Sequence, residues 1–292
     1  NKRVDGPAMK SPSLPTGVAI PRLGLGTWRL GESRTGRAAD VAAVRSAIEI
    51  GYRLIDTAEM YGEGGAEEVV GQAVADALRA GDVRRDELFI VSKVYPHNAS
   101  RKATVQACER SRRRLGLDSI DLYLLHWRGE HALADTVAAM HALVAGGQIA
   151  HWGVSNFDLT DMAELWSTPG GNQVAANQAL YNLARRGIEW DLLPWCRDKG
   201  IPVMAYSPVG QGALLTHRKL ATLAAPLGVT PAQLALAWSI REPHVMSIPQ
   251  STDKSHIDDN RSAAAVRLSP ATLAALDSAF PPPRGPVPLA VL

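Results

Sequence analysis

Residues 54–70, LIDTAEMYGEGGAEEVV, combine an apolar run, an aspartate, a tyrosine and a glycine-rich bend. One interpretation is that the glycines form a phosphate cradle, because glycine loops before helices expose backbone N–H groups to anions. The other is that Asp56 and Tyr61 carry the chemistry and the glycines only turn the chain. Three glutamates surround the glycines and would repel an anion, which favours the second interpretation. Glu59 receives no catalytic role.

Lys93 and His126 follow two further apolar runs and complete a set of groups suited to proton transfer. A phenol has a pKa of about 10 and is by itself a weak donor to a carbonyl oxygen. An ammonium group beside Tyr61 would lower that pKa, and Asp56 would hold the lysine and keep it charged. A histidine nearby would hydrogen-bond the substrate oxygen or the phenol. Together the four side chains would make Tyr61 a general acid that works at neutral pH.

The residues that other reaction types require are missing from this set. The sequence has no serine nucleophile elbow, no paired carboxylates and no metal-ligand cluster beside these groups, and Cys108 and Cys196 each stand alone. We therefore predict no metal site and no disulfide framework. A proton donor without a nucleophile indicates that another molecule supplies the reducing equivalent.

Eight short apolar runs, with helical patterns between most of them, are the elements that must position these groups. Apolar strands alternating with helices indicate a parallel sheet, and eight units about 30 residues apart favour a closed (β/α)₈ barrel. The runs are residues 22–27, 52–57, 88–93, 120–126, 150–156, 174–178, 201–207 and 244–250. In such a barrel the carboxyl ends of the strands share one face, where barrel enzymes place their sites. The polar groups above stand at those ends.

The alternative architecture is an open Rossmann-type sheet, which would carry GxGxxG after its first strand. Here Gly24 and Gly26 are followed by Trp28, which is too bulky for the close helix approach that the third glycine permits. The sequence therefore favours the barrel.

The composition agrees with a globular protein that forms a full core. Of 292 residues, 46% are hydrophobic and 21% are charged, and the net charge is only +2. The cluster at residues 112–114 falls on an amphipathic helical pattern, so we expect a solvated face and no nucleic-acid partner. No run reaches the length of a membrane span. We expect a soluble, cytoplasmic monomer in which residues 1–10 are a flexible or added tail and residues 11–292 form one barrel domain.

Several motifs in order, GLGTW, LIDTAEMYG, VSKV, LLHW, GVSN, NQ, AYSP and IPQS, resemble the aldo-keto reductase superfamily along essentially the whole chain. The segments DLYLLHWRG and WGVSNFDLTDMAELW look particularly like bacterial members that reduce methylglyoxal and related small aldehydes. The resemblance implies an NAD(P)H-dependent carbonyl reductase on a (β/α)₈ barrel without a metal. In that reaction hydride passes from C4 of the nicotinamide to the carbonyl carbon.

The resemblance also assigns roles to the four polar groups. Tyr61 would be the proton donor, and Lys93 would lower its pKa. Asp56 would pair with Lys93, and His126 would orient the carbonyl. The substrate pocket would be lined by Trp28, Tyr61, Tyr95, His126 and Trp127, with Met60 nearby.

The same resemblance places the cofactor along the rim of the barrel. Ser155, Asn156 and Gln178 would bind the nicotinamide carboxamide, and Tyr206 would stack on the ring. The pyrophosphate would follow Ser207, Pro208, Val209 and Gln211, and the adenine would meet Asp259 and Asn260. The remaining expected contacts are Gly26, Thr27, Trp28, Asp56, Ile248, Gln250, Ser251, Thr252 and His256.

Two of these positions depart from the usual pattern of the family. Gln250 and His256 stand where many members have a lysine and an arginine that hold the adenosine 2′-phosphate. Their loss weakens charge-assisted binding of that phosphate. We therefore expect NADPH as the cofactor, with a weaker preference than usual and NADH as the alternative.

The end of the chain, LDSAFPPPRGPVPLAVL, is proline-rich and lacks the long aromatic loop of some family members. We expect a wide site that favours small or varied aldehydes, of the methylglyoxal type or aromatic, over steroids. The competing hypotheses are a cofactor-binding regulatory subunit with little turnover, and a barrel hydrolase or lyase acting on sugar phosphates.

Overall fold

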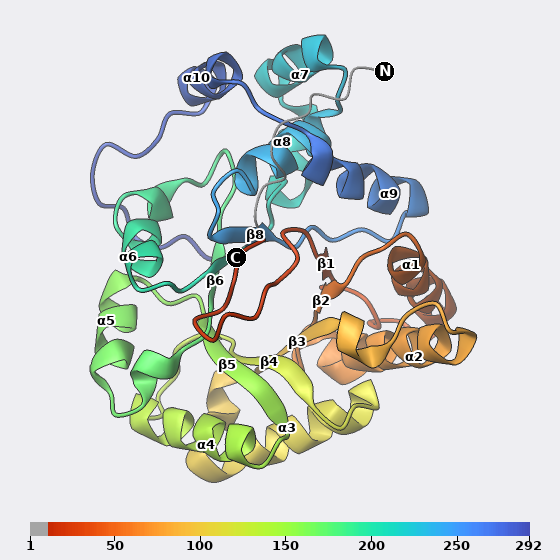
Figure 1. Ribbon diagram of the computed structural model, residues 1–292, viewed down its shortest axis with the longest axis vertical. Helices are drawn as coiled ribbons and strands as arrows, with labels where there is room; N and C mark the ends of the chain where they lie inside the picture. The colour runs from red at the N-terminus through yellow and green to blue at the C-terminus, as the bar shows by residue number, and fades with distance from the viewer. Residues whose placement is uncertain (1–10) are drawn as a thin grey trace.

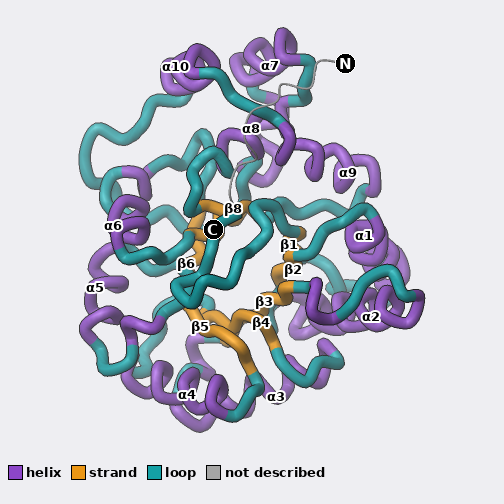
Figure 2. Tube along the Cα trace, in the orientation of Figure 1, coloured by secondary structure: helices purple, strands orange, loops and turns teal. Residues whose placement is uncertain are grey.

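The computed structural model describes residues 11–292, in which eight parallel strands form one sheet in the order β1 to β8 (Figure 1). Parallel bridges join Leu23 to Ser247 and Gly26 to Gln250, so the first strand meets the last and the sheet closes. The helices surround the strands (Figure 2). The predicted (β/α)₈ barrel is confirmed, whereas the proposed tail at residues 1–10 lies outside the described residues.

Each of the eight predicted runs contains or overlaps a strand. The strands are β1 (Leu25–Gly26), β2 (Leu54–Asp56), β3 (Phe89–Val94), β4 (Ile120–Leu125), β5 (Ile149–Ser155), β6 (Asn177–Leu180), β7 (Val203–Tyr206) and β8 (Val245–Ser247). The run at residues 174–178 begins too early, because β6 pairs with β7 only from Asn177 onward. The run at 244–250 is too long, and within it Pro249 has no N–H to donate to a ladder.

Ten α-helices lie between and after the strands in the described residues. They are α1 (Arg37–Glu49), α2 (Gly65–Ala80), α3 (Arg101–Leu115), α4 (Leu133–Ala145), α5 (Leu159–Ser167), α6 (Leu192–Asp198), α7 (Arg218–Ala224), α8 (Pro231–Ser239), α9 (Lys254–Ser262) and α10 (Pro270–Ala279). Six of them, α3, α5, α6, α8, α9 and α10, begin at a side-chain cap. Helix α8 has Pro231 in its first turn, and the Thr230 side chain accepts a hydrogen bond from the N–H of Gln233. Both features favour the start of a helix.

Two apolar clusters lie on the two faces of the sheet. The larger packs the outward side chains of the strands, such as Ile55 and Ile90, against the helices. The smaller contains the alternate residues Leu54 and Val91 together with Ile20 from the amino-terminal segment. Because side chains alternate along a strand, the residues two positions beyond Leu54 and Val91 also point into the barrel. The apolar inner layer therefore lies directly beneath the polar groups at the strand ends.

No single helix within residues 11–292 is long and apolar enough to span a membrane. Only residues 218–227 and 231–239 taken together meet that test, and they are bent by 89° at their junction.

Candidate active site

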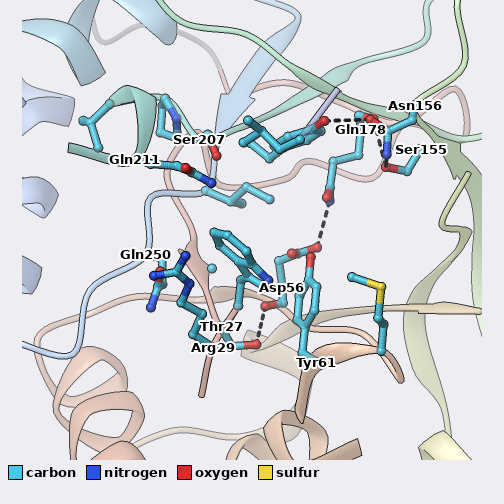
Figure 3. A pocket seen from close by; sticks show the side chains of 18 of the residues that line it. Thr27, Arg29, Asp56, Tyr61, Ser155, Asn156, Gln178, Ser207, Gln211 and Gln250 are labelled. Carbon is cyan, nitrogen blue, oxygen red and sulfur yellow. Dashed lines mark hydrogen bonds between the residues drawn. The ribbon is translucent and has the colours of Figure 1, made fainter. Parts of the chain in front are cut away.

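The carboxyl ends of the strands surround a cavity of about 530 Å³. Most of the predicted site residues line it, namely Gly26, Thr27, Trp28, Asp56, Tyr61, His126, Trp127, Ser155, Asn156, Gln178, Tyr206, Ser207, Pro208, Val209, Gln211, Ile248 and Gln250. Figure 3 shows some of them around one space, from segments that are far apart in the sequence: Thr27, Asp56, Tyr61, Ser155, Asn156, Gln178, Ser207, Gln211 and Gln250. The size falls within the range of small-molecule sites, which is about 300–1,000 Å³.

Lys93 is fully buried beneath the cavity and uses all three of its N–H donors. Its Nζ lies 2.8 Å from Oδ2 of Asp56, 2.8 Å from the carbonyl oxygen of Thr57 and 3.1 Å from the hydroxyl oxygen of Tyr61. Asp56 lies two residues after Leu54 on β2, and Lys93 lies two residues after Val91, the β3 partner of Asp56, so both side chains point inward. The strand register therefore brings together the three groups that the sequence grouped by type.

Burial and charge act against each other in this pair. Burial alone would lower the pKa of Lys93, but the Asp56 carboxylate and the Tyr61 phenol outweigh it and raise the pKa above its usual value. Burial raises the pKa of Asp56, and Lys93 and a hydrogen bond from Gln178 oppose that rise. The result is an ammonium group that stays charged at neutral pH and is held in one position.

The pKa of Tyr61 is raised, whereas the sequence analysis predicted that Lys93 would lower it. The phenol therefore stays protonated at neutral pH. Burial raises its pKa above the usual value, and the ammonium of Lys93 lowers it only partly. The sequence argument counted the lysine and left out burial, so the net shift is upward. A protonated phenol is the form that a proton donor needs, and the ammonium of Lys93 is placed to stabilise a phenolate at Tyr61.

His126 is buried and adjoins Tyr61 edge to face, with ring centroids 5.7 Å apart. Burial first, and the charge of Lys93 second, lower the pKa of His126 well below its usual value, so the imidazole is neutral. Its Nδ1 has no hydrogen-bond partner among residues 11–292. A neutral imidazole carries one N–H donor, which suits it to orient a carbonyl oxygen without giving up a proton.

The residues expected to bind the carboxamide are already linked to one another and to Asp56. Gln178 donates from Nε2 to Oδ1 of Asp56 at 2.8 Å, and the Ser155 hydroxyl donates to the Gln178 carbonyl oxygen at 3.0 Å. The Tyr206 hydroxyl donates to Oδ1 of Asn156 at 2.7 Å (Figure 3). Burial raises the pKa of Tyr206 to about 12. The amides and the phenol are therefore held in place by contacts within the protein.

Comparison with known proteins identifies the family of this chain. Residues 22–280 match the Aldo/keto reductase family. The chain belongs to that family. Methylglyoxal reductase YeaE of Escherichia coli is 50% identical over 273 residues, which are 92% of this chain and 94% of that protein. Glyoxal reductase of Bacillus subtilis is 34% identical over 269 residues, 91% of each chain.

Solved structures agree with this assignment. A Klebsiella pneumoniae aldo-keto reductase in complex with NADPH superposes with a TM-score of 0.91 and 47% identity, over 97% of this chain and 99% of the other. The enzyme from the same species with NADP and acetate gives a TM-score of 0.92. The chain is thus an oxidoreductase of the aldo/keto reductase type.

Some of the predicted site residues do not line the cavity. Those that do not line it are Lys93, Tyr95, Ser251, Thr252, His256, Asp259 and Asn260. Lys93 lies below the cavity in contact with Tyr61, whereas the hydroxyl of Tyr95 donates to Glu63 at 2.9 Å. Asp259 accepts from the Thr230 hydroxyl at 3.0 Å and from Nε2 of Gln233 at 2.7 Å, so its carboxylate is used inside the protein. Roles for these residues stay predictions.

The first turn of α9 differs from an open phosphate site. Oδ1 of Asp253 accepts hydrogen bonds from the N–H groups of Ser255 at 2.8 Å and His256 at 3.1 Å. A hydrogen bond from the Ser255 hydroxyl first, and these two backbone hydrogen bonds second, hold the pKa of Asp253 below its usual value. A carboxylate therefore caps the helix beside the segment expected to hold the 2′-phosphate.

The reductase also has cavity residues that the sequence argument missed. They are Arg29, Gly212, Leu215 and Leu292. The guanidinium of Arg29 lies 4.4 Å from the centroid of the Trp28 ring. Because Arg29 directly follows Trp28, a predicted site residue, its position in the sequence could have indicated that it lines the cavity. Leu292 reaches the cavity from the far end of the chain (Figure 1), and no local pattern indicates this.

Left-handed backbone at non-glycine residues concentrates around the same cavity. Within residues 11–292 these residues are Arg29 (φ 68°), Glu63 (φ 50°), Asn156 (φ 58°), Ser207 (φ 48°) and Gln211 (φ 54°). Four of them line the cavity, and Glu63 lies two residues after Tyr61. Such conformations are unfavourable for residues with a Cβ and gather where a protein fixes functional groups.

In the described part of the chain no group of three or more His, Cys, Asp or Glu side chains is arranged to hold a metal.

Proposed function

We propose that this reductase converts small aldehydes and ketones to alcohols, with NADPH as the hydride source and Tyr61 as the proton donor. The observation that carries the proposal is the contact of the buried Lys93 with both Asp56 and Tyr61, directly below the cavity. Tyr61 and His126 both line that cavity, so a carbonyl oxygen between them meets two hydrogen-bond donors. The relatives named for methylglyoxal and glyoxal reduction support these compounds as substrates.

The residues around the cavity fit a nicotinamide cofactor. Ser155, Asn156 and Gln178 provide hydroxyl and amide groups for its carboxamide, and Tyr206 provides an aromatic face for its ring. The cofactor supplies the hydride that reduces the carbonyl carbon. The relatives crystallised with NADPH and NADP support the phosphorylated form.

The protein's own groups handle the oxygen of the substrate. The N–H of neutral His126 and the O–H of Tyr61 hydrogen-bond the carbonyl oxygen and orient it. As negative charge develops on that oxygen, the Tyr61 O–H bond breaks and the proton forms the alcohol O–H. The phenolate left behind is stabilised by the ammonium of Lys93, which in turn is held by Asp56. Tyr61 recovers its proton from solvent before the next turnover.

The cofactor preference is proposed to be weaker than in relatives with two cations at the 2′-phosphate. Gln250 and His256 are exposed and lack permanent charge, and the carboxylate of Asp253 caps the adjacent helix turn. Lys254, exposed at the start of α9, remains as a cation for the phosphate, together with the hydroxyls of Ser251 and Thr252. We therefore propose NADPH as the main cofactor and NADH as an accepted alternative.

The substrate side of the cavity supports small and varied carbonyl compounds. Trp28, Met60, Trp127 and Leu292 offer apolar surface there. A carbonyl held by Tyr61 and His126 would present its substituents to this surface. We further propose that residues 11–292 work as one domain and as a monomer, because residues of this one chain line the cavity. We also propose that the protein works in the cytoplasm.

The direct test follows the loss of reduced-nicotinamide absorbance with purified protein, NADPH and either methylglyoxal or 4-nitrobenzaldehyde. Turnover is expected with both, and absence of turnover with any aldehyde would contradict the proposal. Tyr61→Phe should lower kcat by about 10²–10⁴-fold while NADPH binding, measured by tryptophan fluorescence, stays unchanged. Binding of NADPH without turnover in the unaltered protein would instead support the regulatory-subunit hypothesis.

A further inference from the structure

Two buried glutamates stand on either side of the turn that carries Tyr61. Glu59 precedes it by two residues and is 5% exposed, and Glu67 follows it in α2 and is fully buried. Neither lines the cavity. A buried carboxylate is unfavourable unless it is paired and hydrogen-bonded, so the partners of these two groups show what they hold together.

Glu67 joins three elements around the active site. The Ser92 hydroxyl on β3 donates to its Oε1 at 2.6 Å, and Nε of Arg114 at the end of α3 donates to its Oε2 at 2.6 Å. Ser92 is the residue before Lys93, so its outward side chain is fixed while the lysine points inward. Glu67 therefore ties α2 and α3 to the strand position next to the buried ammonium.

The guanidinium of Arg114 also lies against the turn that follows Tyr61. Gly64 has a φ of 93°, and a Cβ placed there would lie 2.6 Å from Nε of Arg114. On the other side of the turn, a Cβ on Gly65 would lie 2.2 Å from the carbonyl oxygen of Gly31. The turn is thus held between the loop after β1 and the Arg114 guanidinium, with no room for a side chain at either place.

Glu59 is held in a related way. Its Oε1 accepts from the N–H of Tyr95 at 2.7 Å and from Nδ2 of Asn98 at 3.0 Å. Its Oε2 lies 3.7 Å from a guanidinium nitrogen of Arg110, which is one helical turn before Arg114 on α3. One face of α3 therefore presents arginines to both buried glutamates, although the Arg110 contact is the longer and more exposed.

We propose that Glu67 and Arg114 are positioning residues that keep the Tyr61 hydroxyl within hydrogen-bond distance of Lys93 and in line with the substrate oxygen. This inference rests on the proposed role of Tyr61 as proton donor. Neither residue touches substrate or cofactor, and both act through the backbone of the turn at residues 61–64. A shift of about 1 Å in a reacting group lowers rates by up to about 100-fold, which gives the pair a measurable effect.

A double-mutant cycle between Arg114→Met and Tyr61→Phe tests the proposal. In the unaltered background, Arg114→Met should lower kcat about tenfold or more and change KM less than about twofold, because the phenol is displaced while the cavity remains. In the Tyr61→Phe background, the same change should lower the residual kcat less than about twofold, because the group it positions is gone. Fluorescence titration should give the same NADPH affinity for all four proteins.

The matched control is Arg186→Met. Arg186 is 7% exposed and pairs with Glu189 at 2.8 Å, but it does not line the cavity. It should lower the midpoint of thermal unfolding at least as much as Arg114→Met while leaving kcat unchanged. If Arg114→Met does not fold, Arg114→Lys takes its place in the same cycle, because it keeps the charge but loses the Nε donor.

The proposal fails if either Arg114 variant lowers kcat equally in both backgrounds, or leaves kcat unchanged, or if Arg186→Met lowers kcat as much. The separate comparison of Tyr61→Phe with the unaltered protein tests the proposed function. If that single change leaves kcat unchanged, the role of Tyr61 is wrong, whatever Arg114 does.

Discussion

Two groups of residues at this face of the barrel are built on different principles. One group, the tetrad, consists of Asp56, Tyr61, Lys93 and His126. The other group, called the phosphate end for its proposed role, consists of Gln250, which lines the cavity, and of Ser251, Thr252 and His256, which do not. The tetrad side chains are buried or half-buried and fix one another through hydrogen bonds and ring contacts, whereas most of the phosphate end is exposed. Beside the phosphate end, the N–H groups of Ser255 and His256 in the first turn of α9 donate to the Asp253 carboxylate.

With the roles proposed above, this difference separates the residues that carry the reaction from the residues that select the cofactor. Lys93 in the barrel interior is stable as an ion only because its partners surround it, so the tetrad tolerates little change. Exposed side chains are screened by water and contribute little to folding, so the phosphate end is open to change. We therefore expect substitutions in the tetrad to affect both stability and chemistry, and those at the phosphate end to affect cofactor affinity alone.

Lys93→Met should give the largest effect. It removes the ammonium that holds Asp56 and Tyr61 and leaves a buried carboxylate unpaired, which should lower the free energy of unfolding by about 3–5 kcal/mol. Without the charge that stabilises the phenolate, kcat should fall by about 10²–10⁴-fold. Urea unfolding and steady-state kinetics measure the two losses.

A double variant distinguishes these two contributions. Asp56→Asn combined with Lys93→Met removes both charges, so it should recover much of the lost stability but none of the activity. The exposed Lys199 provides the control, because Lys199→Met should change neither quantity. If the double variant recovered kcat, the chemical role given to Lys93 would be wrong.

The pH dependence should also separate the tetrad from ordinary surface groups. Because the pKa of Tyr61 is raised, the phenol remains a donor through neutral pH, and kcat should fall only above about pH 10. Raised folded-state pKa values also mean that the stability gained from Tyr61 and Lys93 is present below their unfolded pKa values. It is lost as the pH rises through the folded ones. A kcat profile and thermal unfolding between neutral and alkaline pH measure both effects.

The acid side of the same profile tests His126. Its pKa is lowered, so the neutral ring should persist in the folded protein below the usual histidine value of about 6.5. The stability it contributes is present above about pH 6.5 and is lost as the pH falls through the folded pKa. We expect no break in kcat near pH 6.5. A break there that disappears in His126→Phe would show that the imidazole titrates in the ordinary range.

The sequence was sufficient to group the tetrad because its members lie at or just beyond the carboxyl ends of three neighbouring strands, β2, β3 and β4. Strand alternation fixes which side chains point inward, and a parallel sheet gathers the carboxyl ends at one face. Asp56 and Lys93 were therefore expected to meet before any distance was known. The prediction of the Tyr61 pKa was incomplete because the extent of burial depends on packing that residue types do not reveal.

Features that depend on contacts between distant segments did not follow from the sequence. Leu292 enters the cavity from the far end of the chain, and the guanidinium of Arg114 stands against Gly64 although 50 positions separate them by their residue numbers. The left-handed backbone of Asn156 and Ser207 is likewise imposed by surrounding structure, since neither residue type requires it. Such contacts arise from the closed barrel as a whole.

Adding charge at the phosphate end should change cofactor affinity without changing the chemistry. Gln250→Lys combined with His256→Arg should lower the Kd for NADPH about tenfold, because charge-assisted hydrogen bonds add about 1.5–3 kcal/mol in favourable cases and less when exposed. The Kd for NADH and the kcat at saturating cofactor should stay within about twofold. Paired fluorescence titrations with NADPH and NADH measure the preference.

Salt provides the control for that experiment. The gain in NADPH affinity should shrink as ionic strength rises, because exposed charges are screened. An equal gain for NADH, or one insensitive to salt, would show that the two positions act through structure and not through the 2′-phosphate.

Trp127→Ala should have the smallest effect and tests the apolar rim of the cavity. The indole is 38% exposed and contacts the His126 ring at a centroid distance of 4.9 Å. Removing it should raise KM for 4-nitrobenzaldehyde about three- to tenfold, because an aromatic substrate loses a stacking surface worth about 0.5–1.5 kcal/mol. Methylglyoxal has no ring to stack, so its KM should change less than about twofold, with kcat retained for both. A fall in kcat for both substrates would instead mean that Trp127 holds His126 in place and belongs functionally with the tetrad.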